Sequence, residues 1–203
     1  MLKKSLILAS VFCIVAMTSF AQRPSETGKW ISYTEGGVLY GSPDNESKAP
    51  FIFHSSLNYA FHRNLSAGIG AGFEFMKETY LPVTANVLYQ FGNKKVSTPF
   101  VRFQAGYQVP LESNTFMPDY TYYYNAFSSY YPGYYPSVSS VQLDSKGGFM
   151  AHPSVGVIVY NSTGLGISLS AGYRYQQLTY QGANDYTLHI QYNRLSLTLG
   201  IIF

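Results

Sequence analysis

The sequence predicts an all-β protein, an eight-stranded antiparallel β-barrel that spans a lipid bilayer, and three observations lead to this prediction. Apolar residues alternate with small polar residues along most of the chain, which is the period-two pattern of strands with one apolar face. Charged residues make up only 11% of the chain, against ~25% in soluble domains, whereas aromatic residues make up 17%. After the N-terminus, no apolar run approaches the ~20 residues of a membrane helix, so short alternating strands would do the spanning.

Residues 1–21 have the layout of a secretory signal peptide, and residues 22–203 are expected to form the barrel domain. A basic start at Lys3 and Lys4 precedes an apolar core that is too short for a membrane anchor, and a cleavage site with small residues ends at Ala21. The only cysteine, Cys13, lies within this segment. The mature chain is therefore expected to have no disulfide and no thiolate metal site.

Eight segments carry the alternating pattern, and each is predicted to be one strand. Their apolar residues are expected to face lipid and their Gly, Ser, Thr, Asn and Gln residues to face the interior. In chain order, the segments are Trp30–Tyr40, Phe51–Phe61, Leu65–Met76, Leu81–Phe91, Val101–Val109, Phe149–Val159, Leu165–Gln176 and Tyr186–Phe203.

The phase of the first segment is ambiguous, because apolar residues occupy both of its faces. Glu35 decides the phase, since a carboxylate facing lipid is costly and the even-numbered residues should therefore face out. Gly36-Gly37 and the phase slip near Tyr192-Asn193 predict β-bulges. Pro153 predicts a local irregularity in its strand, because proline cannot donate to a ladder.

Three glycines occupy alternate positions on the inner face of the third segment, at Gly68, Gly70 and Gly72. Glycine on a strand face leaves space for a neighbouring side chain or backbone. We therefore expect large side chains from other strands to fill the space above these glycines.

The connections differ in length in a way that orients the barrel. Those after the second, fourth and sixth segments are short, whereas those after the first, fifth and seventh are longer, and the one after the third is the exception. Short periplasmic turns and long outer loops are the usual arrangement in outer-membrane barrels. Outward aromatic residues near strand ends, such as Tyr59 and Phe61, predict two girdles at the membrane interfaces.

The last nine residues show the alternation most clearly. Leu195, Leu197, Leu199, Ile201 and Phe203 share one face, and Ser196, Thr198 and Gly200 share the other. This segment resembles the terminal strand of bacterial outer-membrane barrels, and the resemblance implies that the barrel assembly machinery reads Phe203. Over nearly the whole mature chain, the pattern resembles the small OmpA/OmpX-type family of outer-membrane β-barrels. The resemblance implies a location in the outer membrane of a Gram-negative cell.

A soluble eight-stranded barrel of the lipocalin type is the structural alternative. In that fold the apolar faces would point inward and the polar faces would point to water. Exposed strands of soluble proteins usually carry Lys and Glu, whereas the polar faces here carry Gly, Ser, Thr and Gln. The composition of the polar faces therefore favours the membrane barrel.

Four charged residues fall on predicted inner faces, and Glu35 joins them if even-numbered residues of its strand face out. They are Glu74, Arg102, Arg174 and Arg194. The interior of an eight-stranded barrel is just wide enough for side chains to fill it, so buried charges in it should pair. Distance from the strand ends places Glu74, Arg174 and Arg194 at similar height in the outer half, so Glu74 is expected to pair with Arg174, Arg194 or both. The set is expected to form structural ion pairs, with a gate or a small-anion site as the alternative.

His54 and Ser56 lie two residues apart on one strand face, which weakly resembles the His/Ser pair of outer-membrane lipid A deacylases. That resemblance implies ester hydrolysis by a serine that a histidine activates. The predicted phase points both residues into the barrel rather than toward lipid, and no carboxylate is identified to orient the histidine. The prediction is therefore that the protein is not an enzyme. His54 with His152 has no recognised ligand spacing, so no metal site and no cofactor are predicted.

A tyrosine-rich segment lies within the longest connection, roughly from Pro110 to Gly147. Tyrosine with Ser, Gly and Asn is the composition of adaptable binding loops, so an extracellular protein or a glycan is a candidate partner. The alternative is a loop that packs its own aromatic rings over the barrel mouth. The tyrosines concerned are Tyr120, Tyr122, Tyr123, Tyr124, Tyr130, Tyr131, Tyr134 and Tyr135.

The sequence thus predicts an integral outer-membrane barrel with a structural or surface-interaction role, surrounded by outer-membrane lipid. A narrow pore for small solutes is the second interpretation, and a lipid-acting hydrolase is the third. The formal net charge of +3 falls to +1 without Lys3 and Lys4, and this small excess gives no indication of nucleic-acid binding.

Overall fold

The computed structural model describes residues 28–41, 49–76, 78–92, 97–111, 114–118, 140–162, 164–182 and 187–203. The predicted signal peptide lies outside these residues, and so do the tyrosines named from the long connection. Among the described residues, no helix is long and apolar enough to cross a membrane.

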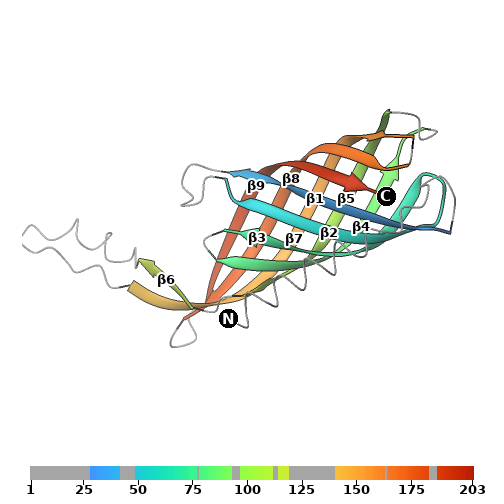
Figure 1. Ribbon diagram of the computed structural model, residues 1–203. Coiled ribbons are helices and arrows are strands. Elements are labelled where there is room, and N and C mark those ends of the chain that lie inside the picture. The colour runs from blue at the N-terminus through green and yellow to red at the C-terminus, as the bar shows by residue number, and fades with distance from the viewer. Residues whose placement is uncertain are drawn as a thin grey trace, which may run out of the picture.

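All the regular structure in the described part of the chain is β-strand (Figure 1). The strands are β1 (Trp30–Gly41), β2 (Phe51–Ala60), β3 (Leu65–Phe75), β4 (Thr79–Gln90), β5 (Ser97–Pro110), β6 (Asn114–Pro118), β7 (Ser140–Tyr160), β8 (Gly166–Gln181) and β9 (Thr187–Ile202).

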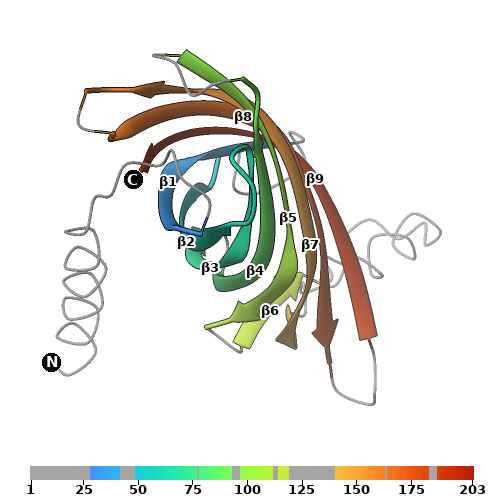
Figure 2. The same cartoon turned by 90° about the vertical axis from the view of Figure 1, so that its right-hand side faces the viewer.

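Eight of these strands close into one antiparallel barrel, as predicted. Neighbouring strands follow the order β5-β4-β3-β2-β1-β9-β8-β7, and β7 pairs with β5 to close the ring. The antiparallel pair of β1 and β9 joins the two ends of the barrel chain. Figure 2 shows the strands wrapping around a common interior.

The short strand β6 lies outside the ring and pairs with the first residues of β7, from Ser140 to Asp144. Together they project beyond the barrel at the left of Figure 1. The sequence placed this part of β7 in a loop, so the strand begins earlier than predicted. Its register shifts between Ser145 and Gly147, where Gly147 has a φ of 78° that favours glycine.

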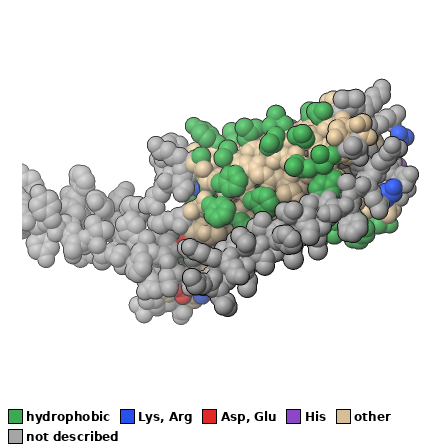
Figure 3. Space-filling view, in the orientation of Figure 1, with side chains coloured by type: hydrophobic (Ala, Val, Ile, Leu, Met, Phe, Trp, Pro, Cys, Tyr) green, Lys and Arg blue, Asp and Glu red, His purple; other side chains and the backbone are tan. Residues whose placement is uncertain are grey.

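Alternation along each strand separates two kinds of surface. The outward side chains are mostly apolar and exposed, and in Figure 3 they form a green band over the middle of the barrel, with Lys and Arg near its ends. Ile69 on β3, for example, is 72% exposed, and Leu199 on β9 is 61% exposed. A continuous apolar belt of this extent is far larger than the patches that monomeric soluble proteins leave in water.

The inward side chains are buried, and they form three successive layers. An apolar cluster lies toward the short turns between β2 and β3, β4 and β5, and β7 and β8. A second cluster, the outer apolar cluster, lies toward the opposite end, which we call the outer end. Polar and charged side chains fill the space between the two clusters. The first cluster comprises Ile31, Tyr33, Ala60, Leu88, Phe100, Ile158 and Ile202, and the second Tyr80, Leu178 and Tyr180.

The glycines on β3 make space for a histidine, as expected. A Cβ on Gly70 would lie 2.5 Å from Cε1 of His54, and one on Gly72 would lie 3.2 Å from its Cδ2. On β8, Gly172 does the same for His152, whose Nε2 would lie 2.8 Å from an added Cβ. Two imidazole rings thus fit into the interior because glycines face them.

The phase predicted for β1 is correct, because Glu35 is 2% exposed whereas Tyr40 is 70% exposed. The bulge predicted at Gly36-Gly37 is wrong, since both glycines pair in register with β2 and with β9. A Cβ on Gly37 would lie 2.8 Å from Cα of Thr198, so this glycine permits a close approach of strands rather than a bulge.

The bulge predicted near Tyr192-Asn193 is also wrong, because β8 and β9 pair without a register shift from Gly166 to Gln181. Near the outer end of β9, the outward residues become polar and the inward residues become apolar, as at Gln191 and Ile190. The chemistry of the two faces therefore changes while the register stays the same.

Pro153 stays in register with Phe103 of β5, but the pairing of β7 with β8 omits His152 and Pro153. The irregularity predicted there is thus a gap in one ladder. At the end of β9, alternation predicts that Phe203 faces out with the leucines. Phe203 is instead only 8% exposed, and its backbone N–H donates to the carbonyl of Ser32 at 3.0 Å.

Candidate functional site

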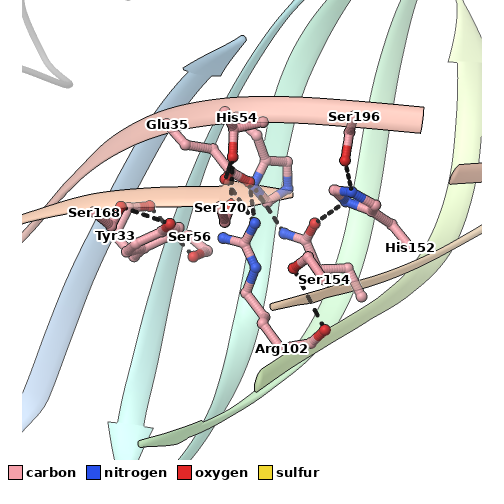
Figure 4. A network of polar contacts seen from close by, with 12 residues as sticks. Tyr33, Glu35, His54, Ser56, Arg102, His152, Ser154, Ser168, Ser170 and Ser196 are labelled. Atoms are coloured by element: carbon pink, nitrogen blue, oxygen red, sulfur yellow. Dashed lines mark hydrogen bonds and ion pairs between the residues drawn. The ribbon is translucent and has the colours of Figure 1, made fainter. Parts of the chain in front are cut away.

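The polar middle layer of the barrel interior is the candidate site, because it gathers the buried charges. Figure 4 shows the part of this layer around Glu35 and Arg102. Arg102 on β5 reaches across the barrel to Glu35 on β1, and its Nη2 donates to both carboxylate oxygens at 2.6 Å. The guanidinium also lies over the ring of Tyr33, 4.5 Å from the ring centroid. Both charged side chains are 1% exposed, so they form a fully desolvated ion pair.

The carboxylate of Glu35 is held by a second strand. The hydroxyl of Thr198 donates to Oε2 of Glu35 at 3.0 Å, and the hydroxyl of Ser170 lies 2.6 Å from that of Thr198. Because the Thr198 proton is engaged with Glu35, Ser170 is the donor to Thr198. Tyr33 reaches β8 through its hydroxyl, which lies 2.9 Å from that of Ser168.

Two histidines and a glutamine form the next part of the layer. The side-chain amide of Gln104 donates to Nδ1 of His54 at 3.3 Å, and its carbonyl oxygen accepts from Nδ1 of His152 at 2.8 Å. His54 therefore carries its proton on Nε2, which donates to the hydroxyl of Thr84 at 2.9 Å. His152 accepts at Nε2 from the hydroxyl of Ser196 at 2.7 Å. With these directions, both imidazoles are neutral and each ring nitrogen has a partner.

A second ion pair lies toward the outer end, where Glu74 on β3 contacts Arg174 on β8. Nε2 of Gln176 donates to Oε2 of Glu74 at 2.7 Å, and Gln108 donates to the same oxygen. Glu74 is 1% exposed and Arg174 is 3% exposed. Each of the two buried carboxylates of the middle layer is thus bound by one arginine and by further donors.

The four charged residues predicted from the sequence all point into the interior, but they do not form one cluster. Glu74 lies with Arg174, whereas Arg102 lies with Glu35. Arg194 is buried at a position directly opposite Arg174 on the neighbouring strand. Among the described residues, no carboxylate lies within ion-pair distance of Arg194, and its guanidinium carbon lies 5.1 Å from the centroid of the Tyr192 ring.

His54 and Ser56 are both buried in the interior, but they do not form a nucleophile–base pair. His54 is bound to Thr84 and Gln104, while the hydroxyl of Ser56 donates to the backbone carbonyl of Tyr33 at 3.3 Å. Ser56 also accepts from Nδ2 of Asn58 at 3.2 Å. The described residues contain no group of three or more His, Cys, Asp or Glu that could hold a metal ion.

The described residues contain one arrangement that is similar to a hydrolytic triad, and the sequence did not predict it. Ser196, His152 and Gln104 are hydrogen-bonded in the order of a nucleophile, a base and an orienting group. The three side chains are at most 4% exposed, and the orienting group is a neutral amide that also binds His54. These hydrogen bonds link the side chains of β5, β7 and β9 within the packed interior.

The outer apolar cluster carries a smaller polar group. The hydroxyl of Tyr80 donates to Oε2 of Glu78 at 2.6 Å and lies 2.9 Å from the hydroxyl of Tyr180 and 3.0 Å from that of Ser145. Glu78 is 5% exposed, although it lies in the turn between β3 and β4. This group joins the turn to β7 and β8 across the outer end of the interior.

The architecture and the polar interior define a small transmembrane-type β-barrel. No family model and no curated protein matches the chain. Among solved structures, the fold is similar to that of Neisserial surface protein A, with a TM-score of 0.52 and 11% sequence identity over 88% of this chain and 100% of that one. It is also similar to outer membrane protein AlkL, with a TM-score of 0.51 and 12% identity over 90% of this chain and 92% of that one.

A third similar structure is the outer membrane protein OprG from Pseudomonas aeruginosa, with a TM-score of 0.51 and 9% identity over 90% of this chain and 99% of that one. The chain therefore has the fold of the small OmpA/OmpX-type outer-membrane barrels, as predicted from the alternation. At these identities, the likeness concerns the fold.

Proposed function

We propose that the protein is an integral outer-membrane barrel with a closed interior, acting as a structural or surface-interaction protein rather than as an enzyme. The observation that carries this proposal is the division of side chains between the two surfaces. An apolar belt faces outward, and buried ion pairs and amides face inward. In water this arrangement would expose the apolar belt, whereas in a bilayer the belt contacts lipid.

The packing of the interior supports a closed barrel over a narrow pore. Phe100, Leu88 and Ile158 are at most 1% exposed at one end, and Tyr80 and Leu178 are 1% exposed at the other. Charged groups held in ion pairs lie between these clusters. A solute would have to displace both apolar clusters and a desolvated ion pair, and each displacement costs several kcal/mol.

A non-enzymatic role is supported by the contacts of the candidate catalytic residues. His54 and Ser56 bind other partners, and the Ser196–His152 pair lies within the packed interior. Surface interaction would then fall to the outer loops. The tyrosines of the long connection are the candidates for binding an extracellular protein or a glycan.

The proposed location is tested by expressing the full chain in a Gram-negative host and separating inner from outer membranes. We expect the protein in the outer membrane, rich in β-structure and migrating differently on a gel before and after boiling. A second arm deletes Phe203, which we propose is read by the assembly machinery, and we expect less protein to assemble. Recovery in the soluble periplasm would contradict the location, and normal assembly without Phe203 would contradict the role of that residue.

A further inference from the structure

Two arginines face each other directly in the outer half of the interior. Arg174 of β8 and Arg194 of β9 are register partners, and each is 3% exposed. Side chains at directly opposed positions have Cβ atoms about 4.5–5.5 Å apart, and like charges in such pairs destabilise a sheet. A pair of buried guanidiniums therefore needs negative charge nearby.

Among the described carboxylates, only Glu74 lies within ion-pair distance of one of these two arginines. Glu74 contacts Arg174 and is held there by Gln108 and Gln176. Among the described residues, no carboxylate lies within 4 Å of Arg194, whose Nε and Nη1 are buried without a hydrogen-bond partner. Nε of Arg174 is buried without a partner in the same way.

Glu78 is the other buried carboxylate near the outer end, and its contacts are different. It accepts from the hydroxyl of Tyr80 at 2.6 Å and forms no ion pair with a described arginine. The ring of Tyr192 lies beneath Arg194, with 5.1 Å between the guanidinium carbon and the ring centroid. This contact orients the guanidinium but supplies no full negative charge.

The other ion pair provides an internal comparison. Nε and Nη1 of Arg102 are also buried without a partner, but Arg102 has one carboxylate of its own, Glu35, which accepts at both oxygens. In the outer half of the interior, Glu74 contacts Arg174, and the opposed Arg194 has no carboxylate of its own among the described residues. The outer layer thus carries one positive charge that its ion pair does not neutralise.

We propose that Arg174 and Arg194 together bind a small oxyanion in the outer half of the barrel interior. Arg174 would offer Nε, and Arg194 would offer Nε and Nη1, since these donors of the two arginines are buried without a hydrogen-bond partner. The planar fork of a guanidinium matches the oxygens of a phosphate, sulfate or carboxylate group. Glu74 contacts Arg174 at Nη2 rather than at Nε, so binding at Nε would add to the ion pair rather than replace it. This site adds a ligand to the proposed closed barrel.

The test uses the full mature chain, folded in a non-ionic detergent and shown to be folded by its heat-dependent gel shift. Inorganic phosphate is titrated at constant ionic strength and binding is measured by calorimetry. We expect one saturable site. Arg194→Gln should weaken phosphate binding about tenfold or more, the scale of one charge-assisted hydrogen bond. The phosphate affinity of Arg194→Lys should lie between those of the unaltered protein and of Arg194→Gln, because lysine keeps the positive charge but lacks the planar guanidinium fork.

Arg63 provides a matched control, since it is exposed in the turn between β2 and β3 at the opposite end of the barrel. Arg63→Gln makes the same change in net charge and should leave phosphate binding unchanged. A second arm adds to the micelles a lipid with a phosphate-monoester headgroup. Displacement of phosphate by this lipid, but not by one with an uncharged headgroup, would identify the oxyanion as a headgroup. Lack of displacement would identify a free ion.

Equal phosphate affinity of the unaltered protein and Arg194→Gln would overturn the proposal, as would undetectable binding to protein that shows the gel shift. Neither result would contradict the proposal of a closed barrel, because that proposal is tested separately by ion conductance. If Arg194→Gln does not fold, the comparison of the unaltered protein with Arg194→Lys decides, since equal affinity there also contradicts recognition by the guanidinium fork.

Discussion

Replacing Glu74 with Gln is expected to lower the free energy of unfolding by about 3–5 kcal/mol, because removing one partner of a buried ion pair leaves an uncompensated charge. Glu74 is 1% exposed and contacts Arg174, while Gln108 and Gln176 both donate to its Oε2. An amide at position 74 would carry no negative charge to bind Arg174. Its own N–H groups would also face the N–H groups of Gln108 and Gln176, which now donate to the carboxylate. The measurement is reversible urea unfolding in lipid vesicles.

Asp144→Asn is the matched control, since Asp144 and Lys146 form an ion pair at 3.9 Å with both side chains 50% exposed. Exposed pairs of this kind contribute about 0–1 kcal/mol. The double variant Glu74→Gln with Arg174→Met should recover much of the lost stability, because it removes both members of the pair. A Glu74→Gln variant no less stable than Asp144→Asn would contradict the buried pair.

Placing an arginine on the outward face at the middle of the belt should cost about 2–4 kcal/mol in a bilayer, and near the interface about 0–1 kcal/mol. Ile69 is 72% exposed near the middle of β3 and has no polar partner to lose, so Ile69→Arg measures the cost of a charge in lipid. Gln191 is also exposed and points outward, but it lies beyond the apolar part of β9.

Unfolding of Ile69→Arg and Gln191→Arg in the same vesicles gives the comparison. The first variant should be clearly less stable or fail to insert, and the second should resemble the unaltered protein. Equal stability of the two variants, both folded, would mean that the outward face of β3 does not meet lipid. The depth dependence separates lipid contact from a general effect of added charge.

The sequence predicted the faces of the strands well because one physical rule governs most of them. Side chains alternate with period two, and lipid on one side and a packed interior on the other impose opposite chemistry. Glu35 alone was enough to fix the phase of β1, since a carboxylate in lipid is so costly. The inward position of Glu74 and Arg174 follows from the same rule.

Alternation gave wrong predictions where the surroundings of a strand change along its length. Near the outer end of β9, the outward face meets water and the inward face joins the outer apolar cluster, so Ile190 and Gln191 reverse the usual pattern. That reversal resembled a phase slip and suggested a bulge that is absent from the β8–β9 ladder. The register shift within β7, at Gly147, was missed because its surroundings read as a loop.

Most partners across the interior could not be predicted, because alternation gives a face and a height but not the direction of a long side chain. Arg102 meets Glu35, which lies on β1, and Gln104 joins His54 to His152. These contacts depend on the barrel's closure and stagger, which bring β5 opposite β1 and β2. Equal height placed Glu74 level with Arg174 and Arg194, which predicted a pair with one or both of them but did not show that Arg174 is the one it contacts.

The central claim is that the barrel interior is closed by two apolar clusters and an ion-paired layer between them. Ion conductance across a planar bilayer, recorded for the unaltered full-length protein after its heat-dependent gel shift has been verified, tests this claim most directly. We expect a trace that stays at the baseline of the bilayer, because Phe100 and Tyr80 are each 1% exposed at the two ends and Arg102 is bound to Glu35 between them. Reproducible single-channel steps from the unaltered protein would contradict a closed interior and favour the narrow pore.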